Sequence, residues 1–469
     1  MLNIDIAERR IRAAFLGISA GVVLGVMPGP GGAQAQNLVD ALALAYLNNP
    51  TLLAARAGVR STDEEVPQAL ANWRPDVAVS ADYGFSQIEN TRSTGNDVDQ
   101  TRQPKGFGVE VTQPLFRGGR TLASTSEAEN NIRAGRARLM STEQTVLTEA
   151  VTAFMNVFRD HAVLKLNVNN EQVLKRQLEA TRDRFEVGEI TRTDVHQAEA
   201  RLARAVADRI QSEGDLDASR ANYENVMGEA APAELNLPPL PGNLPDEKAA
   251  ALKIASTKNP DVIGAEFDRR AALDTADGVW GELLPEVELT GSWTRDYQSA
   301  AECCQTTTTA LKLNVTIPIY QQGAVYSRLR EARQDAAQTT LLIDQERRDA
   351  VEAAAAAWDA LLTAQARVKA FNAQIDANVV ALEGVEREAA VGSRTVLDVL
   401  DAEQELLDSR VAHVRAQRDE IVTTYQVLSS VGRMTARDLE LPVTRYDPRG
   451  HYNEVRGKWF GGKSQGGVK

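Results

Sequence analysis

The sequence has 469 residues and a formal net charge of -13, and 43% of it is hydrophobic while only 5% is aromatic. The acidic balance excludes a nucleic-acid partner, because proteins that bind nucleic acids present a basic face to the phosphates. The only two cysteines, Cys303 and Cys304, are adjacent and do not form a disulfide framework. Alanine dominates the apolar residues, and this favours closely packed helices.

Residues 1–35 have the features of a secretory signal peptide. Arginines at positions 9, 10 and 12 precede an apolar run, and Ala33-Gln34-Ala35 has the pattern after which signal peptidase cuts. We expect the mature chain to begin at Gln36, and because this residue is not cysteine, we expect no lipid anchor there. No later segment approaches the roughly 20 apolar residues of a spanning helix, so any membrane-spanning segments are expected to be strands.

Two parts of the chain, residues 36–228 and 246–432, carry the same pattern. The matching pairs are Asn49-Pro50 with Asn259-Pro260, Pro114-Leu115 with Pro318-Ile319, Val187-Gly188 with Val391-Gly392, Asp194-Val195 with Asp398-Val399, and Gly228 with Gly432. Two copies are too few for a solenoid, so we predict one structural unit that was duplicated and fused. A Pro-rich linker, residues 229–245, joins the copies. The tail, 433–469, is expected to be irregular and partly disordered, above all from Arg449.

Each copy is predicted to contain a helix, two strands and two long helices, in that order. The leading helices are expected at residues 38–72 and 247–280, and the strands at about 75–90, 104–115, 285–297 and 308–319. Apolar and polar residues alternate along every strand, so each strand has one apolar and one polar face. Segments of roughly 10 alternating residues suit a membrane β-barrel, although a soluble sandwich alternates in the same way.

Long proline-free stretches follow the strands and favour the membrane barrel over the sandwich. The expected helices are 119–187 with its return 193–227, and 324–391 with its return 395–431. At about 1.5 Å per residue, the first helix of each pair is on the order of 100 Å long. From Ala150 to Val168, positions spaced alternately by four and three carry apolar residues and His161, which indicates a coiled-coil seam. Each copy therefore forms a long helical hairpin with its tip near Gly188 or Gly392.

Four amphipathic strands per chain do not close a membrane barrel, because closure needs at least eight strands and lipid tolerates no open edge. The chain is therefore expected to oligomerise. Two copies give eight strands with a filled interior, whereas three give twelve strands and a lumen, and the strand number alone does not choose between them. Because the long hairpins continue from the strands, the assembly is expected to be a passage.

Three segments resemble conserved motifs of the TolC family of outer-membrane channels. RFEVGEITRTDV (184–195) and VGSRTVLDVLDA (391–402) look like its paired hairpin tips, and PLFRGGR (114–120) resembles its strand-to-helix junction. The resemblance covers residues 38–432. It implies a mixed α and β membrane protein that forms a homotrimer. Each chain contributes four strands to a twelve-stranded outer-membrane barrel, and this barrel continues into a periplasmic α-helical barrel. It also implies two partners, a periplasmic adaptor (membrane fusion protein) and an inner-membrane ABC transporter or other pump.

The residues of the first tip motif look most like those of family members that are paired with type I secretion transporters. The implied function is the exit duct of a type I protein secretion system. Two alternatives stay open. One is a duct of the same fold for multidrug or metal efflux, since the pump selects the cargo, and the other is a periplasmic coiled-coil adaptor.

Two aspartates near the second tip are candidates for the pore constriction. Asp398 and Asp401 are three positions apart and thus on one helical face, and by resemblance they match the pore-lining aspartates of the family. Three chains supply six carboxylates, whose ring attracts cations and whose crowding is expected to raise some of their pKa values. The alternative is that acids in a first helical turn only cap the helix or favour its dipole.

The same resemblance assigns a latch and a docking surface to the tips. Arg394 matches the latch arginine, and Asp194 matches the acid on the neighbouring hairpin with which closing contacts are made; the alternative is an ordinary surface ion pair worth under about 1 kcal/mol. Ala389 stands where the best-known members have a tyrosine, so we expect a looser or differently connected closed state. Gly188 and Gly392 provide the turn geometry, and adaptor hairpins are expected to dock around them.

We expect no enzyme activity, catalytic residue, cofactor or metal site. Residues 457–464 spell G-x-x-x-x-G-K-S, the phosphate-binding loop pattern, but no strand precedes this segment and no helix follows it. The four histidines, at 161, 196, 413 and 451, lack metal-ligand spacing, and no catalytic triad or zinc motif is present.

Overall fold

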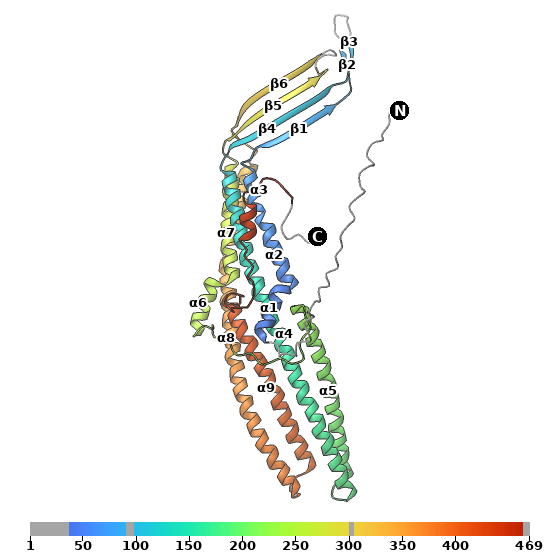
Figure 1. The fold of residues 1–469 in the computed structure, drawn as a ribbon. Coiled ribbons are helices and arrows are strands. Elements are labelled where there is room, and N and C mark those ends of the chain that lie inside the picture. Colours follow the sequence, from blue (N-terminus) through green and yellow to red (C-terminus); the bar gives the residue numbers. More distant parts are fainter. Residues whose placement is uncertain (1–36, 91–97, 300–303, 463–469) are drawn as a thin grey trace, which may run out of the picture.

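The computed structural model describes residues 37–90, 98–299 and 304–462. Within these ranges the chain is elongated, with β-strands at one end and the tips of two helical hairpins at the other (Figure 1). The expected signal peptide and Cys303 lie outside the described residues.

The two leading helices are both broken, so the expectation of one continuous helix in each copy was wrong. The first copy has α1 (Leu38–Asn48), α2 (Pro50–Asp63) and α3 (Glu65–Ala71), and the second has α6 (Lys248–Lys258) and α7 (Pro260–Gly281). One break in each copy falls at an Asn-Pro pair, because proline disfavours helical geometry in the preceding residue and suits the first position of a new helix. The further break, between α2 and α3, falls at Glu64. The Asn49 side chain accepts the Thr51 N–H at 3.0 Å and caps α2.

The side chains of the same two asparagines also form hydrogen bonds to the ends of the return helices of the two long hairpins. The Asn49 amide donates to the Val226 carbonyl at 3.0 Å, and the Asn259 amide donates to the Ser430 carbonyl at 3.2 Å.

By length and composition, no single described helix is a candidate membrane span, whereas 38–48 and 50–71, bent by 46°, pass that test together. The buried side chains of α1 belong to the main core.

Four strands form one antiparallel sheet in the order β1-β4-β5-β6. Their bounds are β1 (Asp76–Tyr83), β4 (Lys105–Arg117), β5 (Glu286–Tyr297) and β6 (Gln305–Thr316). The strand expected at 75–90 is divided at Gly84, whose N–H bonds to the carbonyl of Pro104 at 2.9 Å. Beyond this point β2 (Ser86–Asn90) and β3 (Val98–Arg102) pair as a separate hairpin, part of which the sequence predicts to be a loop.

The strand register places the apolar residues of all four strands on one face of the sheet. Val79 pairs with Val109, which in turn pairs with Trp293, and Leu289 pairs with Leu313. The opposite face carries polar residues, among them Asp76, Glu110, Thr112, Thr290, Ser292 and Lys312. The apolar face is uncovered in the single chain, since Val79 is 65% exposed and Leu313 60%.

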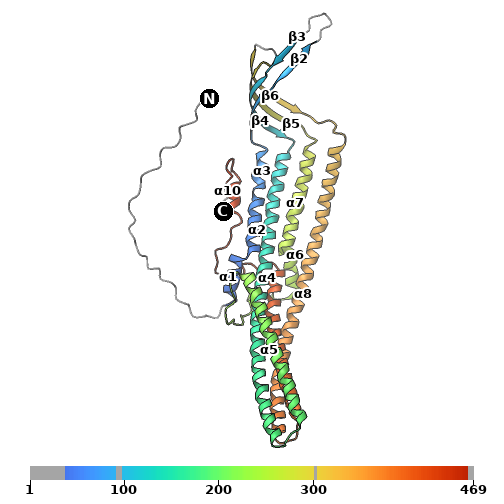
Figure 2. The ribbon, with the colours of Figure 1, turned by 90° about the vertical axis from the view of Figure 1, so that its right-hand side faces the viewer.

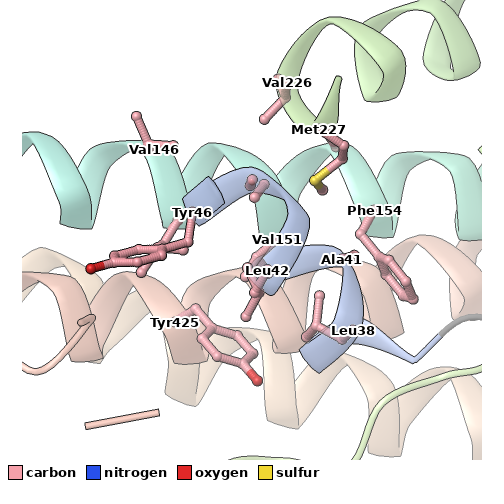
Figure 3. Close-up of a cluster of buried hydrophobic side chains, with 14 of the residues drawn as sticks. Leu38, Ala41, Leu42, Tyr46, Val146, Val151, Phe154, Val226, Met227 and Tyr425 are labelled. Atoms are coloured by element: carbon pink, nitrogen blue, oxygen red, sulfur yellow. The ribbon is translucent and has the colours of Figure 1, made fainter. Parts of the chain in front are cut away.

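The long helices form two hairpins that extend from the sheet (Figures 1 and 2). They are α4 (Arg120–Glu186) with α5 (Arg192–Met227), and α8 (Ala324–Ala390) with α9 (Val396–Ser430). With 67 residues each, α4 and α8 are about 100 Å long. The main core lies where the hairpins meet α1 (Figure 3). Its members include Leu38, Leu42 and Tyr46 of α1, Val151 and Phe154 of α4, Met227 of α5 and Tyr425 of α9.

The described part of the tail, 433–462, is irregular as expected apart from one short helix, but several of its residues pack against the rest of the chain, which the expectation of partial disorder did not include. Met434, Leu441 and Val455 are buried, and residues Gly450–Val455 form α10, which lies beside α2 (Figure 2). Of these buried residues, Val455 lies in the Gly- and Lys-rich end of the tail, where composition alone did not reveal it. The described part of the 457–464 segment follows a helix and not a strand.

Candidate functional site

Both hairpin tips have the same turn. Gly188 (φ +83°) and Gly392 (φ +81°) occupy the left-handed region, which costs other residues free energy. The Gly188 N–H donates to the Phe185 carbonyl at 2.9 Å, and the Glu189 N–H donates to the Arg184 carbonyl at 3.0 Å. Gly392 and Ser393 repeat these two bonds. This pair of bonds satisfies the last carbonyls of each long helix and reverses the chain.

A reciprocal cap begins each return helix. The Asp398 carboxylate accepts from the backbone N–H of Thr395 at 2.9 Å and from its hydroxyl at 2.8 Å, while the Thr395 hydroxyl accepts from the Asp398 N–H at 3.3 Å. Thr191 and Asp194 form the same cap in the first hairpin. Asp398 therefore has the capping role that the sequence left open as the alternative, and Asp194 has the same role, which the sequence did not predict.

The environment of Asp398 favours its charged form. Hydrogen bonds from the Thr395 backbone and hydroxyl, and the charge of Arg394, lower the pKa of this carboxyl. The raised pKa expected from crowding concerns the carboxylates of three chains together, and it stays a prediction. The cap also fixes the carboxylate at the start of α9.

The expected latch between Arg394 and Asp194 is not formed within the described chain. Arg394 Nε instead donates to Glu388 Oε2 at 2.9 Å, across the turn of its own hairpin, and Asp194 is held by its cap. A local partner six positions away is easier to reach than one on another hairpin. Ala389, which replaces the expected tyrosine, contributes only its carbonyl to the turn.

A different pair connects the two hairpins. The Arg201 guanidinium on α5 contacts the Asp401 carboxylate on α9. Around this pair, Val396 and Leu400 of α9 pack in one apolar cluster with side chains of the first hairpin, including Val195. Sequence reasoning missed Arg201. One feature of the sequence could have indicated it. The equivalent position in the second copy is Glu405, so the two copies carry opposite charges at this position and can attract each other there.

Glu403 is a partly buried acid two residues beyond Asp401, and it too was missed. Burial, and secondly the charge of Glu386 on α8, raise the pKa of Glu403 to about 7, while Arg176 on α4 opposes the shift. Its Oε2 atom is buried and has no hydrogen-bond partner in the part of the chain that the structure describes. The tip region therefore contains a carboxyl whose charge changes near neutral pH.

The family model of outer membrane efflux proteins matches residues 41–229 and 251–432. The chain belongs to this family. The two matched segments correspond to the two copies seen in the sequence and the fold, and the resemblance to TolC-type channels is confirmed. It is a protein of the outer membrane, in a family whose TolC-like channels span the outer membrane and the periplasm, and it is an efflux channel.

Several family members are similar over most of their length. Outer membrane efflux protein BepC of Brucella suis biovar 1 is 34% identical over 92% of each chain. Outer membrane protein TolC of Escherichia coli is 24% identical over 87% of this chain and 84% of its own, and proteases secretion protein PrtF of Dickeya chrysanthemi is 26% identical over 81% and 84%. The solved CmeC outer membrane channel of Campylobacter jejuni has a TM-score of 0.78 at 14% identity, and covers 96% of this chain and 98% of that one.

Proposed function

We propose that this efflux channel is the exit duct of a type I protein secretion system. Three copies form a twelve-stranded barrel in the outer membrane and a helical tunnel through the periplasm. The tunnel meets a periplasmic adaptor and an inner-membrane ABC transporter. The observation that carries the proposal is one apolar face, shared by all four strands and joined directly to hairpins about 100 Å long.

The sheet supplies the argument for the trimer. Its edge strands are β1 and β6, and neither has a second strand partner among the described residues. Lipid does not tolerate such open edges, so β1 of one copy is expected to pair with β6 of the next. Three repetitions of this contact close a barrel with a lumen. The apolar face then lies against lipid, and the polar face lines the passage.

At the periplasmic end, we propose that Asp398 and Asp401 of three chains form the constriction. Their capped and ion-paired positions at the start of α9 hold the carboxylates at the tip. We assign Arg394 and Asp194 to a latch between neighbouring copies, since the single chain does not join them. Adaptor hairpins are proposed to dock around the turn glycines, residues 188 and 392.

Two kinds of cargo are supported by the names of relatives. The name of PrtF refers to protease secretion and supports a protein cargo. The second candidate is efflux of drugs or metal ions; a metal cargo is supported by the name of cobalt-zinc-cadmium resistance protein CzcC of Cupriavidus metallidurans, which is 23% identical over 85% of this chain. Cells that lack this chain distinguish the two: loss of a secreted protein supports the first, and increased drug or metal sensitivity with normal secretion supports the second.

The channel itself is tested with purified mature protein in planar bilayers. We expect small, cation-selective conductance steps from a trimer, and crosslinking in native outer membranes should give the same trimer. Oligomers that are folded but form no channels, together with release from membranes by high salt, favour the periplasmic adaptor and overturn the proposal.

A further inference from the structure

The end of the described tail lies at the foot of the membrane sheet. Arg74, just before β1, donates a hydrogen bond from Nη1 to the Lys458 carbonyl at 2.9 Å. Its guanidinium also lies over the Trp459 ring, 4.9 Å from the ring centroid. These two contacts place Trp459 at the level where α3 ends and β1 begins, as the course of the tail beside α2 and α3 also shows (Figures 1 and 2).

Specific contacts along the tail bring it to this position. The Tyr446 N–H donates to the Tyr46 hydroxyl at 3.0 Å, and His451 Nδ1 lies 3.2 Å from Oδ2 of the fully buried Asp63. One turn later, Arg456 pairs with a glutamate of α4 at 3.3 Å. A segment held at successive points on α1, α2 and α4 has a defined end, so its last aromatic residues are positioned by the fold.

Two large aromatic side chains at this end are directed to solvent in the single chain. Trp459 is 57% exposed and Phe460 is 87% exposed, and their ring centroids are 6.5 Å apart. At the same level, the connection from β6 to α8 exposes Ile319 (91%) and Tyr320 (77%). Tryptophan and tyrosine gather at membrane–water interfaces, where the apolar part of the ring and its polar group are both accommodated.

The charge beside the aromatic pair is positive. Between Glu454 and the last described residue, the tail contains two bases and no acid: Arg456, which is paired with Glu129 of α4, and Lys458. Arg74 adds a further base at the same level. Basic side chains next to membrane-inserted aromatics are attracted by anionic headgroups, at about 1 kcal/mol for each base near the surface.

We infer that residues 456–462 form an interfacial anchor for the periplasmic leaflet of the outer membrane. Trp459 and Phe460 enter the headgroup region, and the basic residues beside them favour anionic phospholipid there. This inference rests on the proposed placement of the sheet in that membrane. The anchor connects lipid to α2 and α4 through the tail, at a site separate from the sheet.

Single cysteines carrying an environment-sensitive fluorophore test the anchor in the reconstituted full-length protein, with Cys303 and Cys304 replaced by serine. The label is placed at Phe460→Cys, and the vesicles contain phosphatidylethanolamine with or without phosphatidylglycerol. We expect blue-shifted emission and about twofold stronger quenching by headgroup-level lipid quenchers than for a label at Asn453→Cys, an exposed position in α10. Removal of phosphatidylglycerol should weaken the quenching.

A label at Leu313→Cys, on the apolar face of β6, separates the two possible failures. Quenching at residue 313 by acyl-chain quenchers without quenching at 460 overturns the anchor and keeps the membrane sheet. Absence of quenching at both positions overturns the sheet placement as well. Blue-shifted emission at 460 that lipid quenchers do not affect places the pair against a neighbouring copy, and this result also overturns the anchor.

Discussion

The Arg201 guanidinium on α5 contacts the Asp401 carboxylate on α9, and this ion pair joins the tips of the two hairpins. Asp401 is also one of the two carboxylates proposed for the constriction. A single pair therefore influences both the separation of the hairpins and the negative charge available to a passing cation. Separating these two effects requires variants that remove one partner at a time.

Replacing Arg201 with glutamine should favour the open tip. Partly exposed ion pairs contribute about 0.2–1 kcal/mol, which corresponds to a change of about 1.5- to 5-fold in the ratio of open to closed states. Removal of the guanidinium also leaves Asp401 unpaired, so cation selectivity should rise. Single-channel recordings of open probability and reversal potential measure both effects.

The matched control is Arg182→Gln. Arg182 bonds to Glu199 at 2.7 Å, and both residues belong to the first hairpin, so this variant removes the same charge without separating the hairpins. Equal open probabilities for the two variants would contradict a role for the Arg201 pair in closure.

Neutralising the proposed ring should abolish block by trivalent cations. In the double variant Asp398→Asn, Asp401→Asn, three chains lose six negative charges, so periplasmic trivalent ions should no longer block the conductance. The substitution at Asp398 also weakens the reciprocal cap at the start of α9. Asp194→Asn disrupts the equivalent cap in the first hairpin, and trivalent block should persist in it. Block that survives the double variant places the constriction elsewhere.

Glu403 should make the tip sensitive to pH. Its pKa is raised from 4.5 to about 7, so the native tip favours the protonated form. The resulting stabilisation is fully present below pH 4.5 and is lost as the pH rises to about 7. We therefore expect the conductance to increase as the pH rises from about 5 to about 8, and Glu403→Gln to remove this dependence.

Glu405→Gln is the control for this experiment. Glu405 is an exposed acid on the same helix, bonded to Gln374 at 3.2 Å. This variant should keep the pH response of the wild type. An unchanged response in Glu403→Gln would exclude Glu403 as its source.

Replacing Gly188 and Gly392 with asparagine should show whether these glycines only form the turn or also allow the adaptor to dock. Alanine at residue 188 or 392 costs about 1–2 kcal/mol in the left-handed region, whereas asparagine adopts this region more readily. A Cβ at either position meets no atom within 4 Å in the single chain. We therefore expect the asparagine variants to form heat-stable trimers that no longer copurify with the adaptor.

Gly323→Asn is the corresponding control, because Gly323 has a φ of +78° and equally open surroundings at the other end of α8. This variant should bind the adaptor normally. Adaptor binding that persists at both substituted tips would leave the glycines with a role in the turn alone.

Periodic and repeated features were the ones that sequence could predict. The long helices, the alternating strands and the tip turns all follow from local patterns that occur twice. The breaks at Asn49 and Asn259 were missed because the apolar pattern continues across them, although the following prolines and the capping side chains interrupt the helix. The packing of the tail was missed because it depends on distant partners such as Asp63, which no local pattern reveals.

The side-chain contacts at the hairpin tips could likewise be predicted only in part. Resemblance pointed to Asp398 and Asp401, and their places on α9 follow from the motif. Their immediate partners do not, because the contact between Arg201 and Asp401 brings together positions 200 apart in the sequence. The buried setting of Glu403 likewise depends on how α4, α8 and α9 pack, and a sequence pattern does not give that packing.

The two open edges of the sheet have a consequence for biogenesis. In the proposed barrel, a lone chain exposes the backbone amides and carbonyls of β1 and β6, and hydrocarbon offers them no partner. Entry into the membrane and closure of the ring must then occur together, so the rate of insertion should depend steeply on the periplasmic concentration of folded chains. A cell that exports few copies would accumulate water-soluble precursors long before it acquires a proportionate number of pores.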